Sequence, residues 1–321
     1  MKKFMFATTA LIGAIASAET AMACGDVSIT EMNWASAGIV TGVSKFLLEQ
    51  GYACKVAVAP SNTVPAVASV AETGKPDIVT ELWLNAVPEF KDLEAKGKVR
   101  TVGHVLSDGG VEGWWIPDYL AKEHPELTKI DAILAHPELV GGKFNNCPEG
   151  WGCRVANDNL KVAYDFAGAG LQVFDHGSGE TLAASIASAY ANKEPWFGYY
   201  WAPTAVLGKY PMVKVDVGPV DAEAHVCNQT DGCATPKRSD YPAAEVVTAV
   251  TTDFATREPA AVDLMSKISF TNAQMGEVLA WQEDNKASID EAVVHFITTY
   301  PDVWSAWVSP EAKEKLAAFV K

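Results

Sequence analysis

Positive charge is scarce in this chain of 321 residues. Lys and Arg together number 25 against 40 Asp and Glu, which gives a formal net charge of −15. An acidic surface repels the phosphates of nucleic acids and the headgroups of anionic lipids, and it weakly concentrates cations. We therefore expect no nucleic-acid partner. With 49% apolar residues the composition is ordinary for a globular protein, and the length allows two lobes.

The sequence also lacks the usual motifs of metal binding and catalysis. Its six His residues show no metal-ligand spacing, and neither a CxxC pair nor an HExxH helix is present. The segment 176–180, His-Gly-Ser-Gly-Glu, does not have the G-x-S-x-G order of a nucleophile elbow and indicates a turn that opens a helix. Asn228 and Asp231 could hold Ca²⁺, but a plain turn is favoured because an EF-hand ligand series is absent. We expect no metal, no cofactor and no enzymatic activity.

A long apolar run occurs only at the N-terminus. Two Lys residues follow Met1, an apolar run extends from Phe4 to Ala18, and residues 21–23 read Ala-Met-Ala. This pattern predicts a secretory signal peptide over 1–23 and a periplasmic location. The run is too short for a membrane anchor. Cys24 would be the first mature residue, and its lipidation is the less favoured alternative because position 21 lacks the Leu usual in lipoprotein signals.

Six cysteines lie outside this signal, and an even count in an exported chain is typical of disulfides. Two pairs are only six positions apart, which leaves the remaining two cysteines for each other. Each of those two precedes an apolar run of the kind found in strands, and neighbouring parallel strands would bring their starts together. The expected disulfides are Cys147–Cys153, Cys227–Cys233 and Cys24–Cys54.

Residues 27–83 alternate between strand and helix patterns. Strands are expected at 27–32, 55–59 and 77–83, and helices at 36–50 and 63–72. This order is typical of a parallel α/β sheet, in which ligands bind at the carboxyl ends of the strands. The residues at those ends are Glu31 to Trp34 and Glu81 to Trp83.

A second unit follows the same plan. Strands are expected at 111–116, 171–175 and 196–201, and helices at 118–123, 130–135, near 157–166 and at 180–192. In both units a Pro precedes a strand that ends in a Trp, namely Trp83 and Trp201. We therefore expect each unit to contribute an indole to a shared aromatic cleft.

The rest of the chain returns to the first unit. Residues 211–241 are irregular and are interpreted as a crossing with a stapled loop, before a strand at 246–250 and helices at 259–268, 272–281, 289–300 and 310–320. The sequence thus predicts an α/β protein of two lobes, each a mostly parallel sheet flanked by helices. Lobe I would comprise 24–109 and 212–321, and lobe II 110–211, with crossings near Gly109 and Tyr210.

The most distinctive stretch is 146–154, Asn-Cys-Pro-Glu-Gly-Trp-Gly-Cys-Arg. Oxidation would close a small ring that presents the indole of Trp151. Such a ring shapes the chain more than it stabilises it, because the entropic contribution of a disulfide grows with loop length. The amides of Gly152 and Cys153 could then point at a ligand anion. We expect this ring to form half of a binding cleft.

Several indoles around one space suit an ammonium group that carries methyl substituents. The face of an indole attracts the charge while the ring buries the methyl groups, at about 0.5–2 kcal/mol per wall. Micromolar binding requires about 8 kcal/mol, so an anion contact must contribute as well. The amides of the ring can supply that contact.

The ring, the Glu81-Leu82-Trp83 sequence and residues 199–203, Tyr-Tyr-Trp-Ala-Pro, together resemble the glycine betaine-binding proteins of ABC importers. The resemblance extends over nearly the whole mature chain in the order of its elements. It implies a two-lobed periplasmic binding protein, type II-like, that closes over its ligand. The implied aromatic box consists of Trp83, Trp151 and Trp201, with Gly152 and Cys153 as anion donors.

Some positions point to other members of the same group. Choline-binding relatives have two further aromatics, which match Trp34 and Trp114 here. Betaine binders can have a His four residues beyond the strand-end Trp, where this chain has Val87. The carboxyl of Glu31 could face the cation or, if protonated, donate to an N-oxide oxygen. The chain is therefore also similar to a trimethylamine N-oxide binder.

The resemblance implies delivery of a small methylated-ammonium osmolyte to an inner-membrane permease with a separate ATPase, by a binding protein expected to be a monomer. Three alternatives remain open. One is a binding protein of the same architecture for an amino acid or a sugar, and another is a sensor linked to a chemoreceptor. The third is a secreted glycosidase-type hydrolase that uses two carboxyls beside Trp residues. The candidate carboxyls are those of Glu31, Glu81, Glu112 and Glu149.

Overall fold

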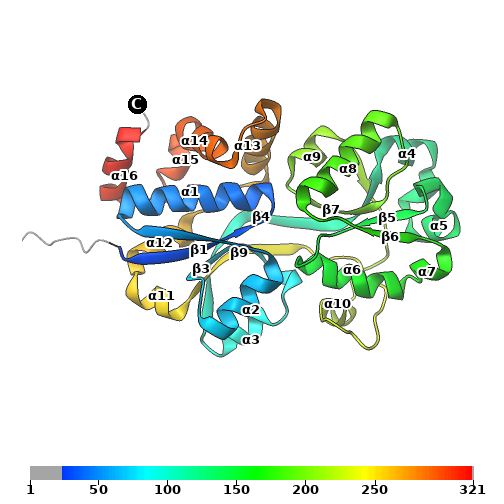
Figure 1. Ribbon diagram of the computed structural model, residues 1–321, viewed down its shortest axis with the longest axis horizontal. Helices are drawn as coiled ribbons and strands as arrows, with labels where there is room; N and C mark the ends of the chain where they lie inside the picture. The colour runs from blue at the N-terminus through cyan, green and yellow to red at the C-terminus, as the bar shows by residue number, and fades with distance from the viewer. Residues whose placement is uncertain (1–23, 320–321) are drawn as a thin grey trace, which may run out of the picture.

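The computed structural model describes residues 24–319, so the predicted signal peptide over 1–23 lies outside the described residues. Two lobes lie side by side, and the strand β4 (Val99–Pro117) passes from one to the other (Figure 1). This arrangement confirms the prediction of an α/β protein with two lobes.

Lobe I combines the N-terminal strands with the C-terminal helices. Its strand β3 is buried at every residue, including the polar Thr80 and Glu81. Helix α14 begins at a capping box formed by Ser288 and Glu291. The elements are β1 (Asp26–Met32), α1 (Ala35–Tyr52), β2 (Lys55–Ser61), α2 (Thr63–Thr73), β3 (Ile78–Trp83), α3 (Phe90–Ala95), β9 (Ala244–Thr251), α11 (Thr252–Arg257), α12 (Pro259–Lys267), α13 (Asn272–Asn285), α14 (Ile289–Thr299), α15 (Pro301–Trp304) and α16 (Pro310–Leu316).

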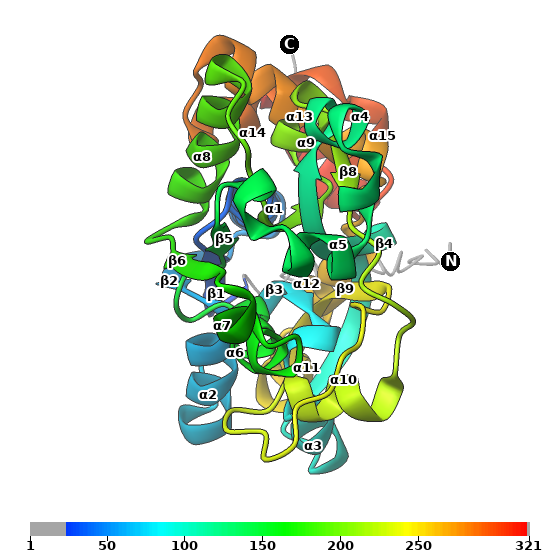
Figure 2. The same cartoon turned by 90° about the vertical axis from the view of Figure 1, so that its right-hand side faces the viewer.

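Lobe II has helices on both faces of its strands, as Figures 1 and 2 show. Helices α4 and α5 have the predicted bounds. The elements, besides the second half of β4, are α4 (Asp118–Glu123), α5 (Ile130–Ala135), β5 (Lys143–Asn146), α6 (Gly152–Ala163), α7 (Phe166–Ala169), β6 (Gln172–Asp175), α8 (Gly179–Asn192), β7 (Gly198–Ala202), α9 (Ala205–Lys209), β8 (Met212–Lys214) and α10 (Ala222–Asn228).

The strands follow the order β2-β1-β3-β9-β4-β7-β5-β6, with β8 paired to β4. The pairs β1–β2 and β1–β3 are parallel, as predicted for the first unit, and the pairs β5–β6 and β5–β7 are parallel as well. The pairs that involve β9 or β4 are antiparallel, because β4 carries the chain out of lobe I and β9 carries it back. The sheet is therefore mixed at the junction of the lobes and parallel on either side of it.

The first crossing lies where predicted, because β4 pairs with β9 up to Gly110 and with β7 from Val111 onward. The second crossing lies later than predicted. Strand β8 pairs with the lobe II half of β4, and the hydroxyl of Tyr164 donates to the carbonyl oxygen of Val217. Helix α10 also packs on α6. Residues 212–241 thus belong to lobe II, and the return crossing lies near Tyr241 rather than Tyr210.

All three predicted disulfides are present. The bond between Cys24 and Cys54 joins the starts of two parallel neighbours, β1 and β2. A sulfur engaged in a disulfide cannot also carry a thioether-linked lipid. This structure therefore contradicts the alternative of lipidation at Cys24.

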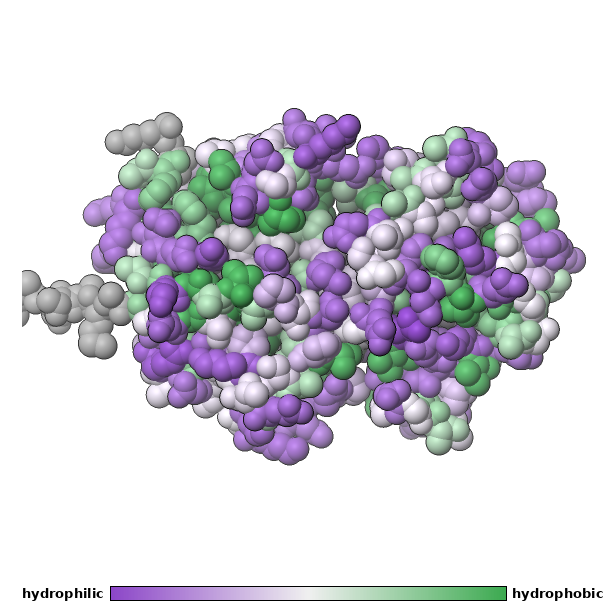
Figure 3. All heavy atoms as spheres, viewed as in Figure 1, coloured by the Kyte–Doolittle hydropathy of each residue, from purple (hydrophilic) through white to green (hydrophobic). Residues whose placement is uncertain are grey.

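The visible face of the molecule is mostly hydrophilic, and hydrophobic residues appear on it only in separate patches (Figure 3). Within residues 24–319, no helix combines the length and the apolar character that crossing a bilayer requires.

Candidate functional site

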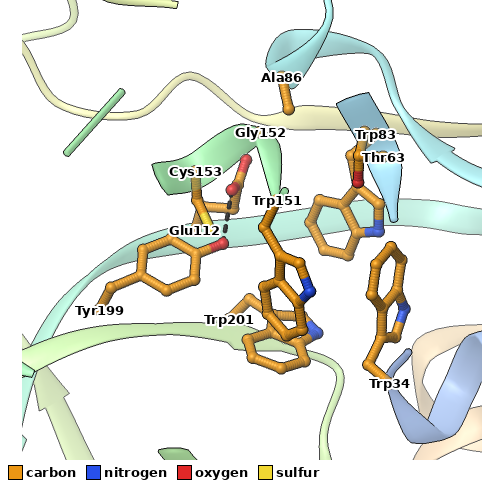
Figure 4. Close-up of a pocket in the computed structure, with 10 residues that line it drawn as sticks. All are labelled: Trp34, Thr63, Trp83, Ala86, Glu112, Trp151, Gly152, Cys153, Tyr199 and Trp201. Atoms are coloured by element: carbon orange, nitrogen blue, oxygen red, sulfur yellow. Dashed lines mark hydrogen bonds between the residues drawn. The ribbon is translucent and has the colours of Figure 1, made fainter. Parts of the chain in front are cut away.

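A small cavity of about 30 Å³ lies between the lobes. Lobe I contributes residues that follow β1 and β3 and one at the start of α2, whereas lobe II contributes residues from β4, β7 and the start of α6 (Figure 4). The lining residues are Trp34, Thr63, Trp83, Ala86, Glu112, Trp151, Gly152, Cys153, Tyr199 and Trp201.

Trp151 stands at the centre of the aromatic wall. Its ring centroid lies 5.2 Å from that of Trp34, at an interplanar angle of 70°. It lies 5.0 Å from that of Trp201, at 80°. Both contacts are edge-to-face, the arrangement that aromatic quadrupoles favour. One indole from the disulfide ring therefore joins an indole of lobe I to another of lobe II.

Trp83 reaches the cavity from the carboxyl end of β3 and rests on the crossing strand. A Cβ added at Gly110 would lie 2.1 Å from Cζ3 of Trp83, which is far inside any allowed contact. Only glycine can therefore occupy position 110 while this indole keeps its place.

Two of the indole N–H groups are hydrogen-bonded behind the wall. Nε1 of Trp34 donates to Oε1 of Glu81 over 2.5 Å. Nε1 of Trp151 donates across the lobe boundary to Oδ1 of Asn33, also over 2.5 Å. These bonds fix the rotation of each ring, so the aromatic faces rather than the edges are left for a ligand.

Glu112 brings a carboxyl to the cavity from the lobe II half of β4. One oxygen accepts from the hydroxyl of Tyr199 over 2.6 Å, and the other accepts from Nδ2 of Asn85 in lobe I. Burial raises the pKa of Glu112 above its usual value, and the bond from Tyr199 opposes that rise in pKa. Among the residues that line the cavity, none is Lys, Arg or His.

The N-terminus of α6 opens at the same cavity. Gly152 and Cys153 are the first two residues of this 12-residue helix, and their amide N–H groups have no acceptor within it. Both residues are buried. A Cβ at Gly152 would lie 2.4 Å from that of Ala86 in lobe I, so the two lobes touch here. Free amides at a helix start favour an anion or a partly negative oxygen.

Further contacts hold the lobes together around the cavity. The amide of Val64 in lobe I donates to the carbonyl oxygen of Gly150 over 3.1 Å. Nζ of Lys209 and Oε1 of Glu283 form an ion pair at 2.5 Å between α9 and α13. A wider groove between α8 and α13 adjoins the cavity and shares Trp34 and Trp201 with it. These two indoles therefore separate the cavity from the open cleft.

Six of the predicted binding residues line this cavity, and two do not. The six are Trp34, Trp83, Trp151, Trp201, Gly152 and Cys153.

The prediction for Trp114 was wrong. This residue lies two positions beyond Glu112 on β4, beneath α6, where Nε1 donates to Oδ1 of Asn157 over 2.9 Å. It is 2% exposed and packs against four other rings of lobe II. It is therefore a core residue. Glu31 is half-buried on β1 and does not line the cavity.

Sequence reasoning assigned no binding role to Glu112 or Tyr199. Glu112 is a buried acid in a strand that is otherwise largely apolar after Gly110, and this was the available signal. The Ca²⁺ alternative for the second ring is not supported, because both polar atoms of the Asn228 side chain bond to the backbone of Lys237.

Comparison with known proteins agrees with this geometry. The family described as the substrate binding domain of ABC-type glycine betaine transport system matches residues 25–299. The glycine betaine, L-proline-binding protein ProX from Borrelia burgdorferi is similar with a TM-score of 0.74 and 16% identity, over 91% of this chain and 99% of that chain.

Two further structures are similar over comparable lengths. An ABC-transporter choline binding protein in complex with choline gives a TM-score of 0.73 at 18% identity, over 93% of this chain and 99% of its own. The lactococcal OpuAC, closed on glycine betaine, gives 0.69 at 17% identity, over 89% and 100%. These similarities confirm the two-lobed periplasmic binding protein fold. The chain belongs to the family of substrate-binding domains of ABC-type glycine betaine transport systems, and it is a solute-binding protein rather than an enzyme.

Proposed function

We propose that this chain binds a small methylated-ammonium compound in a cage of Trp34, Trp83, Trp151 and Trp201. The observation that carries the proposal is the convergence of four indoles from both lobes on one cavity that no basic side chain lines. A quaternary ammonium cannot lose its charge and donates no strong hydrogen bond, so indole faces suit it better than a carboxylate alone.

The cage alone does not account for tight binding. Four walls at about 0.5–2 kcal/mol each contribute about 2–8 kcal/mol before the entropic cost of association. Micromolar affinity corresponds to about 8 kcal/mol. The polar end of the ligand must therefore contribute as well.

That polar end would meet the amides of Gly152 and Cys153 and the carboxyl of Glu112. The amides donate to an oxygen of any of the three ligands, glycine betaine, trimethylamine N-oxide or choline. Because burial raises the pKa of Glu112, its protonated form can donate to an N-oxide or a carboxylate oxygen, and its ionised form can accept from the hydroxyl of choline. In this proposal Glu112 has the role that the sequence analysis gave to Glu31, which was to face the cation or, if protonated, to donate to an N-oxide oxygen.

The test is a thermal-shift panel on the purified chain from Cys24 onward, followed by calorimetry on each compound that responds. The panel contains glycine betaine, choline and trimethylamine N-oxide, with a set of amino acids and sugars as the comparison. We expect at least one methylated-ammonium compound to raise the melting temperature and to bind with micromolar affinity or better. A response confined to amino acids or sugars would contradict the proposal.

The cellular setting follows from the same proposal. A signal over 1–23 would export the chain to the periplasm, where it acts as a monomer and delivers its ligand to an inner-membrane permease driven by a separate ATPase. Closure of the lobes over the ligand would create the surface that the permease recognises. Uptake of the ligand by cells that lack the gene for this chain would contradict this role.

A further inference from the structure

Glu81 occupies an unusual backbone position at the end of β3. Its φ is +49°, in the left-handed region that non-glycine residues rarely adopt. The pairing of β3 with β9 shifts register between Val79 and Leu82, around this residue. Such a conformation costs about 1–3 kcal/mol and persists where the surroundings require it. Here this conformation directs the Glu81 side chain toward Trp34 and Ser36.

That side chain lies behind the lobe I half of the cage. It is 0% exposed, and its Oε1 accepts from Nε1 of Trp34 over 2.5 Å and from Oγ of Ser36 over 2.7 Å. Its Oε2 is buried and has no hydrogen-bond partner among residues 24–319. A buried carboxylate oxygen without a partner is costly, and a positively charged neighbour would lower that cost.

The charges near Glu81 do not supply that neighbour. Its pKa is raised to about 7 by burial, against the hydrogen bonds from Trp34 and Ser36 and the nearby indole of Trp83, and no Lys, Arg or His contributes to the shift. The elements packed against β3 carry acids, which are Glu31 on β1, Glu112 on β4 and Glu245 on β9. They also carry Lys45 on α1 and Arg100 and His104 on β4, but none of these three side chains contributes to the pKa shift of Glu81. The site around Glu81 is thus short of positive charge.

We propose that Glu81 is a positioning residue for Trp34 and the buried counter-charge for the ligand's ammonium group. This inference rests on the proposed function, because it assigns a partner to the cation in the cage. Glu81 differs from Glu112 in this respect, since both oxygens of Glu112 already accept hydrogen bonds from the protein. A bound cation favours ionised Glu81, so binding releases a proton near neutral pH and affinity falls as the pH drops below about 7.

The first experiment separates charge from shape. Choline and glycine betaine are each compared by calorimetry with an uncharged-centre isostere, 3,3-dimethylbutan-1-ol and 3,3-dimethylbutanoate, in which carbon replaces nitrogen. Glu81→Gln keeps an acceptor oxygen for Trp34 and Ser36 but removes the charge. We expect it to weaken binding of the ammonium ligand at least tenfold while binding of the isostere changes less than twofold. Glu31→Gln is the matched control and should change neither.

Equal losses for ligand and isostere in Glu81→Gln would show a merely structural role, and no loss would show no role; either result overturns the inference. Failure of the wild-type chain to bind any ammonium compound would overturn the proposed function and the counter-charge with it.

The second experiment needs no ligand. In protein labelled with ¹⁵N at tryptophan, the Nε1–H resonance of Trp34, assigned with Trp34→Phe, should move with pH around a midpoint near 7. It should not move in Glu81→Gln. A resonance that ignores pH in the wild-type chain would show that Glu81 does not control this indole.

Discussion

The two lobes build their halves of the cage in opposite ways. In lobe II, a disulfide ring and a helix start present Trp151, and the carboxyl of Glu112 is fully hydrogen-bonded. In lobe I, the strand end is strained and Glu81 keeps one buried oxygen without a partner. The lobe II carboxyl therefore has hydrogen-bond partners for both oxygens within the protein, whereas the lobe I carboxyl keeps one oxygen for the ammonium group that we propose. We therefore expect Glu112 to contribute to fold stability as well as to the polar end of the ligand, and Glu81 to contribute to the binding of the cation.

The largest effect should follow from removing the indole that joins the halves. Trp151→Ala removes one wall and releases both neighbouring rings, so we expect a loss of affinity of a hundredfold or more, about 3 kcal/mol or more. Trp83→Ala and Trp201→Ala should each cost at least tenfold. Calorimetry measures the loss, with Trp281→Ala as the control, because that ring stacks on His295 and does not line the cavity.

Affinities that stay unchanged in the three cage variants, while circular dichroism shows an intact fold, would refute the aromatic cage.

The two carboxyls should respond with opposite signs when stability is measured. The folded pKa of Glu81 is about 7 against an ordinary 4.5, so the unfolded chain releases this proton first as pH rises. The folded state therefore loses stability between about pH 4.5 and 7 by up to about 3 kcal/mol, at about 1.4 kcal/mol per pKa unit. Glu81→Gln should remove this loss and stabilise the ligand-free protein above pH 7.

Glu112→Gln should instead destabilise the protein by about 1–3 kcal/mol, since a new amide N–H₂ would face the donors of Tyr199 or Asn85. Urea unfolding of both variants at pH 5 and pH 8 measures the difference. If both variants changed the free energy of unfolding in the same direction, the proposed difference between the lobes would be wrong.

The two disulfide rings offer a further contrast, because each closes over a sequence separation of 6. Replacing Cys147 and Cys153 by Ser should lower affinity about tenfold, as the ring holds Trp151 and the start of α6. Replacing Cys227 and Cys233 by Ser should leave affinity within twofold and affect stability alone. For both double variants, calorimetry measures the affinity and thermal melts measure the stability. Similar affinity losses in the two would mean that the first ring has no special role.

The smallest effect concerns the ion pair across the cleft. Lys209 and Glu283 are partly exposed, so their attraction is screened and contributes less than about 1 kcal/mol. Lys209→Met should weaken binding less than fivefold, and the effect should vanish at high salt. A larger, salt-independent loss would show that this pair, rather than the cage, holds the lobes closed.

Local patterns predicted much of this molecule. Strand-end indoles and disulfide partners depend on neighbours in the sequence or on the repeating order of strand and helix, and these were found correctly. The strand β5 was missed because its four residues, Lys143–Asn146, carry three polar side chains. This strand is buried because it pairs with β6 and β7 and is covered by helices. A local sequence pattern cannot predict burial by such distant elements.

The positions of Trp114 and Glu112 relative to the cavity could not be predicted either, because they also depend on elements that are distant in the sequence. They lie on one face of β4, two residues apart, and only the position of α6 decides which of them meets the cavity. The return crossing was misplaced because residues 212–241 are held to lobe II by backbone bonds and short contacts rather than by a long periodic element.

Gly110 belongs to β4, the strand that both lobes share, and its backbone lies directly against the six-membered ring of Trp83. The indole of Trp83 therefore packs at the point where the chain first crosses from one lobe to the other. If the lobes rotate about this crossing, the backbone beneath Trp83 rotates with it, and we expect the spacing of the indoles to change with the angle between the lobes. Under the proposed function, a solute too large for the space between the indoles would then keep the lobes from closing.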